Sequence, residues 1–128
     1  MRLLLIEDDM NVAEMLATAF REEGHTTTVQ HTGESGLSQL AIERPDAVVL
    51  DVLLPKMNGI EVLRHIRAND PTLPVIIVSG FATPGQLDEA RRLGVTEIIS
   101  KPHILTHFTD ALARAAGVGG RPPGTFSG

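Results

Sequence analysis

The sequence predicts an α/β fold built on a five-stranded parallel sheet, doubly wound so that helices cover both faces. Short apolar runs rich in Val, Ile and Leu alternate with helical patterns, and every connection between them is short. The runs themselves do not alternate with polar residues, which is typical of strands buried on both faces of a parallel sheet. A β-α order repeated five times with short connections favours this architecture over all others.

The strands are predicted from the apolar runs, of which the one at residues 26–29 is the weakest. Short runs of branched apolar residues bounded by turn signals indicate strands rather than helices. In chain order the predicted strands are Leu3–Ile6, Thr26–Val29, Ala47–Leu50, Val75–Val78 and Glu97–Ile99.

The segments between the strands carry apolar residues three or four positions apart, which predicts helices whose apolar positions belong to the core. These apolar sets are Val12, Leu16 and Phe20; Leu37, Leu40 and Ala41; Ile60, Leu63 and Ile66; and Phe108, Leu112 and Ala115, with a shorter helix over residues 84–93. Asp9 and Asn58 are suited to cap helix starts, and Pro84 suits a first turn. Gly24 and Gly94 lie where a helix end needs a left-handed residue.

Length and composition narrow the class of protein. The 128 residues predict one domain, placed at residues 1–117, followed by a Gly- and Pro-rich tail or linker over residues 118–128. The absence of cysteine excludes disulfides and thiol chemistry, and a net charge of −5 with two lysines argues against direct nucleic-acid binding. No run approaches the roughly 18 apolar residues of a membrane span, so we expect no membrane association and a cytoplasmic location.

Polar residues gather at the ends of the predicted strands. Glu7 and Asp8 follow the first strand, Asp51 ends the third, Ser79 ends the fourth and Lys101 lies just beyond the fifth. The carboxyl ends of parallel strands share one edge of the sheet, where ligands bind. We therefore expect these side chains to converge on one pocket.

The chemistry of such a pocket follows from its charges. Two carboxylates about 5 Å apart repel by about 3 kcal/mol at an effective dielectric of 20, so the acids need a cation. Carboxylate oxygens without His or Cys favour Mg²⁺ or Mn²⁺ over zinc. Mg²⁺ typically keeps coordination positions open for water and for a phosphate oxygen. Asp51 beside that ion is the candidate nucleophile toward a phosphoryl group, with Lys101 and the Ser79 hydroxyl contacting phosphoryl oxygens.

Four motifs at matching spacings carry a family resemblance: LLLIEDD, VVLDVLLPKMNGIEVL, VIIVSG and IISKP. Together they resemble the CheY-like receiver domain of two-component response regulators. The resemblance implies the flavodoxin-like fold with strand order 2-1-3-4-5, and a phosphorelay signalling domain rather than an enzyme. It implies a sensor histidine kinase or phosphotransfer protein as phosphodonor. It also implies a downstream protein target bound through the fourth helix, fifth strand and fifth helix, and allows a homodimer.

The resemblance also assigns the site residues. Asp51 becomes the phosphoacceptor, Lys101 the phosphoryl-binding lysine and Ser79 the switch hydroxyl. The metal ligands are Asp8 directly, Glu7 through water, Asp51, and the backbone carbonyl of Leu53. The Lys101-Pro102 peptide bond is expected to be cis.

Several positions depart from the family pattern. Ile98 occupies the position of an aromatic switch residue, so we expect no aromatic readout there, and His103 replaces a common Phe after Lys101-Pro102. Leu53 and Phe81 lie two residues after the acceptor and the switch hydroxyl and offer no polar group to water. They predict a slowly hydrolysed phosphoryl group.

Other interpretations remain open at this point. An aspartyl-phosphate phosphatase of the haloacid dehalogenase type shares the nucleophile, lysine, hydroxyl and metal, although its general acid would fall at Leu53. The other alternative is a receiver-like binding module that is never phosphorylated. Asp9 is interpreted as a helix cap only. The five histidines are interpreted as surface residues, because none has a partner in any of the motifs: His25, His31, His65, His103 and His107.

Overall fold

The computed structural model describes residues 1–101, 110, 111 and 113–115. Strands and helices alternate along the chain, as predicted, and residues 110, 111 and 113–115 are helical. The bounds are β1 Arg2–Ile6, α1 Met10–Glu22, β2 Thr26–Gln30, α2 Gly33–Ile42, β3 Ala47–Asp51, α3 Gly59–Asn69, β4 Val75–Ser79, α4 Pro84–Arg92 and β5 Glu97–Ser100. Each predicted strand is confirmed to within one residue at either end.

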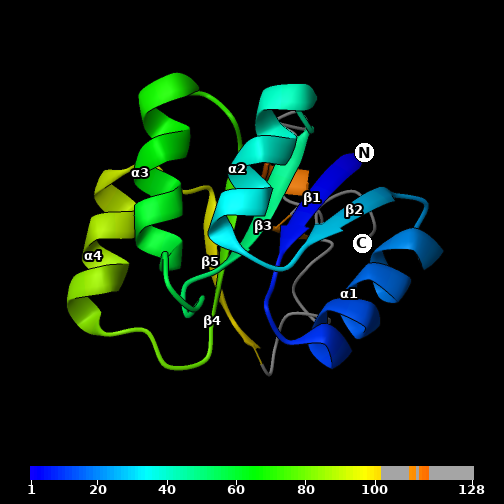
Figure 1. Ribbon diagram of the computed structural model, residues 1–128, viewed down its shortest axis with the longest axis horizontal. Helices are drawn as coiled ribbons and strands as arrows, with labels where there is room; N and C mark the ends of the chain where they lie inside the picture. Colours follow the sequence, from blue (N-terminus) through cyan, green and yellow to red (C-terminus); the bar gives the residue numbers. More distant parts are fainter. Residues whose placement is uncertain (102–109, 112, 116–128) are drawn as a thin grey trace, which may run out of the picture.

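The five strands form one parallel sheet in the order β2-β1-β3-β4-β5 (Figure 1). Alternate residues of β1 face opposite sides: Leu3 and Leu5 join the core beneath α1, while Leu4 and Ile6 join the core beneath α2, α3 and α4. All five residues of β3 are buried. Burial on both faces is the reason that the strands read as unbroken apolar runs.

Helix ends follow the predicted signals. Asp9 caps α1 by accepting from the Asn11 and Val12 amides, and Asn58 caps α3 by accepting from the Glu61 amide. Pro84 begins α4. Gly24 and Gly94 have φ values of 93° and 73°, so each helix is ended by a residue without a Cβ in the left-handed region.

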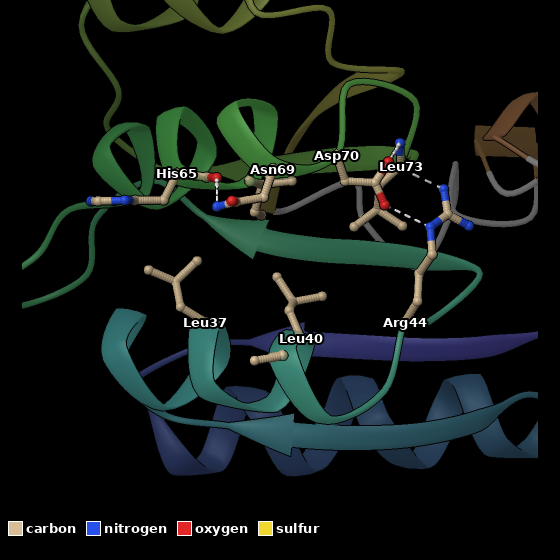
Figure 2. A pocket seen from close by; sticks show the side chains of 9 residues that line it. Leu37, Leu40, Arg44, His65, Asn69, Asp70 and Leu73 are labelled. Carbon is tan, nitrogen blue, oxygen red and sulfur yellow. Dashed lines mark hydrogen bonds and ion pairs between the residues drawn. The ribbon is translucent and has the colours of Figure 1, made fainter.

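Helix α2 confirms the prediction in part: Leu37 and Leu40 pack against the core, whereas Ala41 does not. Its fully buried residues are Gly33 and Gly36, whose backbone lies so close to α3 and β1 that a Cβ at position 33 would lie 2.7 Å from Val62 and one at position 36 would clash with Ile6. Figure 2 shows Leu37 and Leu40 directed toward α3 across a cavity of about 500 Å³. Both leucines are half-buried and Ala41 is exposed, so this face of α2 is only partly covered.

Some predictions fall outside the described residues. They are the cis bond at Pro102, the positions of Phe108 and Leu112, the side chains of His103 and His107, and the boundary between residues 117 and 118. Within the described part of the chain, no helix is both long and apolar enough to cross a membrane.

Candidate functional site

Three of the predicted site residues meet at the carboxyl edge of the sheet. Asp51 is the last residue of β3, Glu7 directly follows β1 and Lys101 directly follows β5. The Lys101 ammonium lies 2.9 Å from a carboxylate oxygen of Asp51 and 2.9 Å from one of Glu7. In the sheet order, β4 lies between β5 and β3, and β3 lies beside β1, so the long lysine side chain reaches past β4 to Asp51 and past β3 to Glu7.

The acids form a compact group. Glu7, Asp8 and Asp51 each place one carboxylate oxygen within 4.8 Å of the others. Glu7 and Asp51 are 1% and 2% exposed, whereas Asp8 is exposed at the mouth. Hard oxygen donors from three carboxylates, one of them open to solvent, fit a divalent cation such as Mg²⁺ that keeps several of its waters.

Burial and charge shift the pKa values of this group. Desolvation raises the pKa of Glu7 to about 7, although the hydrogen bonds from Lys101 and from the Asp9 amide oppose the shift. Burial lowers the pKa of Lys101, but the hydrogen bonds and negative charges of Asp51 and Glu7 outweigh burial, so its pKa is raised overall. Lys101 therefore stays charged and places a positive charge beside both buried acids.

The Asp51 carboxylate is held by one partner on each oxygen. Its Oδ2 accepts from Lys101, and its Oδ1 accepts from the Leu53 amide at 3.0 Å. The Leu53 amide thus points at the acceptor, and coordination of a metal by the Leu53 carbonyl stays a prediction. Asp51 is fixed in a pocket where Lys101 presents a charged donor for any group placed on it.

Gly59, the first residue of α3, packs directly against the backbone of the acceptor residue. Its amide donates to the Val52 carbonyl at 2.7 Å, and a Cβ at this position would clash with the Asp51 carbonyl oxygen. The start of α3 therefore lies against the backbone of the acceptor residue. A side chain at position 59 would displace one of the two.

Ser79 lies at the same edge, at the end of β4, but its hydroxyl is engaged elsewhere. Its Oγ accepts from the Ala82 amide at 3.0 Å, which closes the loop between β4 and α4. In that loop Phe81 is 86% exposed. Ile98, at the predicted switch position of β5, is half-buried beside the core under α4.

His31 is a site neighbour that sequence reasoning missed. It is half-buried, and its Nδ1 lies 3.0 Å from the Glu7 carbonyl oxygen, so it lies beside the site although it belongs to none of the sequence motifs. His25 has the terminal ammonium of Met1 3.1 Å from its Nδ1, whereas His65 is exposed as expected. The signal for His31 was its place one residue beyond β2, at the edge shared by Glu7 and Asp51.

Comparison with known proteins decides the family. The model of the response regulator receiver domain family matches residues 3–113. This chain belongs to the response regulator receiver domain family. The receiver domain is 33% identical over 114 residues to the regulatory protein AtoC of Escherichia coli K12, covering 89% of this chain and 25% of AtoC. It is 31% identical over 105 residues to the response regulator MprA of Mycobacterium avium, covering 82% of this chain and 46% of MprA.

Solved structures agree with the receiver fold. A CheY-like receiver domain protein from Methanospirillum hungatei superimposes with a TM-score of 0.86 at 22% identity, covering 91% of this chain and 93% of that one. A putative response regulator from Chloroflexus aurantiacus gives 0.83 at 26% identity, covering 91% and 97%. The predicted fold and family are confirmed. The chain spans a quarter of AtoC and about half of MprA, so it corresponds to one part of those proteins.

Proposed function

We propose that this receiver domain accepts a phosphoryl group on Asp51 from a histidine kinase or phosphotransfer protein, with Mg²⁺ at the acidic group. The observation that carries this is the placement of the Lys101 ammonium 2.9 Å from both Asp51 and Glu7. A buried carboxylate with a fixed cation beside it suits in-line attack on phosphorus, because positioning and charge neutralisation supply most of the catalysis of phosphoryl transfer.

In the proposed step an oxygen of Asp51 forms a bond to phosphorus as the bond from phosphorus to the donor imidazole nitrogen breaks. The electron pair of that bond stays on the imidazole nitrogen, and because the other ring nitrogen of the donor carries a proton, the imidazole leaves as the neutral ring. Lys101 then pairs with one phosphoryl oxygen. The Ser79 hydroxyl, which accepts from the Ala82 amide in the structure, turns to donate to a second phosphoryl oxygen. Asp8, Glu7, Asp51 and the Leu53 carbonyl would hold the metal ion, and a bound Mg²⁺ would supply charge neutralisation for the phosphoryl group.

The surroundings of Asp51 favour a protein as the donor. The described residues include five large, exposed apolar side chains, and three of them follow the adjacent strands β1, β3 and β4 at this edge: Met10 at 70%, Leu53 at 42% and Phe81 at 86% exposed. Large apolar side chains exposed along one edge of a domain are typical of protein interaction sites. A cytoplasmic histidine kinase domain would supply both the phosphoryl group and a protein surface that covers these apolar side chains.

The output is proposed to be a change in protein contacts. Phosphorylation draws Ser79 and Lys101 toward the phosphoryl group. Ser79 ends β4 and leads into the loop before α4, and Lys101 directly follows β5. The population of one conformation of the face formed by α4, β5 and the last helix then shifts. A downstream protein or a second copy of the domain would bind that face.

Mass spectrometry after incubation with Mg²⁺ and acetyl phosphate tests the proposal, with Asp51→Asn as the control. We expect one phosphoryl group on the wild-type protein and none on the variant. If the wild-type protein stays unmodified, and beryllofluoride with Mg²⁺ changes neither its spectrum nor its oligomeric state, the result would support a binding module that is never phosphorylated. Steady turnover of p-nitrophenyl phosphate would support the haloacid dehalogenase alternative.

A further inference from the structure

His31 lies at the carboxyl edge of the sheet, where it contacts the backbone of a buried acid. It follows β2 directly, and its Nδ1 is 3.0 Å from the carbonyl oxygen of Glu7. A carbonyl oxygen only accepts hydrogen bonds, so the imidazole donates and Nδ1 carries the proton. The ring is thereby fixed in one tautomer and one orientation.

This side chain replaces a missing backbone partner. The Glu7 amide donates to the Gln30 carbonyl at 3.0 Å, which continues the parallel ladder between β1 and β2 by one residue. In a parallel ladder the matching donor to the Glu7 carbonyl would be the amide of Thr32. That amide donates to Ser35 Oγ in the capping box of α2, and the imidazole of His31 takes its place.

The consequence reaches the acidic group through Glu7. The Glu7 backbone is held on its amide by Gln30 and on its carbonyl by His31, and its side chain is 1% exposed. One carboxylate oxygen pairs with Lys101 and the other accepts from the Asp9 amide. With both backbone groups fixed, the carboxylate has little freedom to turn away from Asp8 and Asp51.

We infer that His31 is a positioning residue for the metal site, holding the Glu7 backbone so that its carboxylate stays beside Asp8 and Asp51. This inference rests on the proposed function, since it concerns the affinity of the same site for Mg²⁺. Groups that orient metal ligands from outside the coordination shell typically change metal affinity by about 10- to 100-fold when removed. His31 acts through the backbone of its ligand, so we expect the lower end of that range.

The test measures Mg²⁺ affinity by calorimetry in the whole chain. His31→Leu keeps the bulk of the ring and removes the donor, and we expect the Mg²⁺ dissociation constant to rise by about ten-fold. His31→Asn places an amide N–H the same number of bonds from Cα as Nδ1, and we expect it to restore most of the affinity. His65→Leu, a change at an exposed histidine on α3, is the matched control and should leave the affinity unchanged.

Each outcome separates this inference from the proposed function. If the wild-type protein binds Mg²⁺ and His31→Leu binds it equally well, the inference is overturned and the proposed function stands. If the wild-type protein binds no Mg²⁺, both are overturned. Should His31→Leu fail to fold, nitrogen NMR of the wild-type imidazole decides: a proton on Nδ1 and a shift of the His31 signal with Mg²⁺ support the inference, and a proton on Nε2 alone overturns it.

Discussion

Lys101 donates to Asp51 across 2.9 Å, and its aliphatic chain passes close to Gly80 in the loop after β4. This contact joins residues 50 positions apart. It places the only cation that contacts the buried acids, within the described part of the chain, directly beside the candidate phosphoacceptor. The predictions below depend on this pair and on the groups that surround it.

Replacing Lys101 by Met should abolish most phosphoryl acceptance. Loss of a charged donor aimed at the transferred group is expected to slow modification of Asp51 by roughly 100-fold, measured by mass spectrometry with acetyl phosphate. The variant should also lower the free energy of unfolding by about 1–3 kcal/mol in chelator, because Glu7 and Asp51 lose a buried partner. Lys56→Met is the matched control, since Lys56 is exposed and is the only other lysine. Equal rates in the two variants would contradict the assigned role.

The stability of the metal-free protein should fall as pH rises. Burial raises the pKa of Glu7 to about 7 in the folded protein, against an ordinary value of 4.5. The folded state therefore retains a proton that the unfolded state has lost across this window, so this contribution is complete below pH 4.5 and is lost as pH rises through about 7. Its size is on the order of 3 kcal/mol.

Urea unfolding in chelator between pH 4.5 and 8 checks this contribution. Glu7→Gln should flatten the pH dependence relative to the wild-type protein. Glu14→Gln, at an exposed acid of α1, should leave it intact. The same slope for wild type and Glu7→Gln would show that Glu7 has no raised pKa.

Substituting Gly59 by Ala should destabilise the protein. The added methyl group would overlap the Asp51 backbone, at an expected cost of about 1–3 kcal/mol in the free energy of unfolding. Gly85→Ala is the matched control, because a Cβ there has only the Thr83 hydroxyl within 4 Å and a helical Ala is favoured over Gly by roughly 0.5–1 kcal/mol. Denaturant unfolding of both variants should give changes of opposite sign. A neutral Gly59→Ala would mean that α3 can move away from Asp51.

The phosphoryl group on Asp51 should be long-lived. Leu53 and Phe81, which lie two residues after Asp51 and Ser79, are exposed, and neither offers a polar side-chain group to position water. Leu53→Asn and Phe81→Glu each introduce a polar group there, and we expect either to shorten the lifetime by roughly ten-fold or more. The decay of the phosphorylated protein in mass spectra measures it. A wild-type lifetime of seconds, or no shortening in either variant, would count against this prediction.

The exposed apolar side chains should affect the rate of phosphotransfer from a protein donor but not from a small phosphodonor. Phe81→Ser removes the most exposed of them and leaves Asp51 and Lys101 untouched, so we expect phosphotransfer from a purified histidine kinase to slow by about ten-fold. Modification by acetyl phosphate should proceed at the wild-type rate. Ile42→Ser, at an exposed residue at the end of α2, is the control. Equal losses with both donors would place Phe81 in the chemistry rather than in recognition.

The fold and the main site residues were predictable because their signals are local. Burial on both faces requires unbroken apolar runs such as Ala47–Leu50, and the end of each run marks the carboxyl edge at which Asp51 and Lys101 meet. Helix caps at Asp9 and Asn58 depend on amides two or three residues away. Neighbouring residues alone determine these features.

Other features were decided only when distant segments met. Whether α2 buries Leu40 or Gly36 depends on how closely its backbone approaches Ile6. The contact of His31 with Glu7 depends on the register of β1 against β2 and on the engagement of the Thr32 amide by Ser35. The sequence alone determined which side chains could perform the chemistry. Strand register and helix approach decided which partners hold them, because a hydrogen bond forms only between groups that the packed backbone brings within reach.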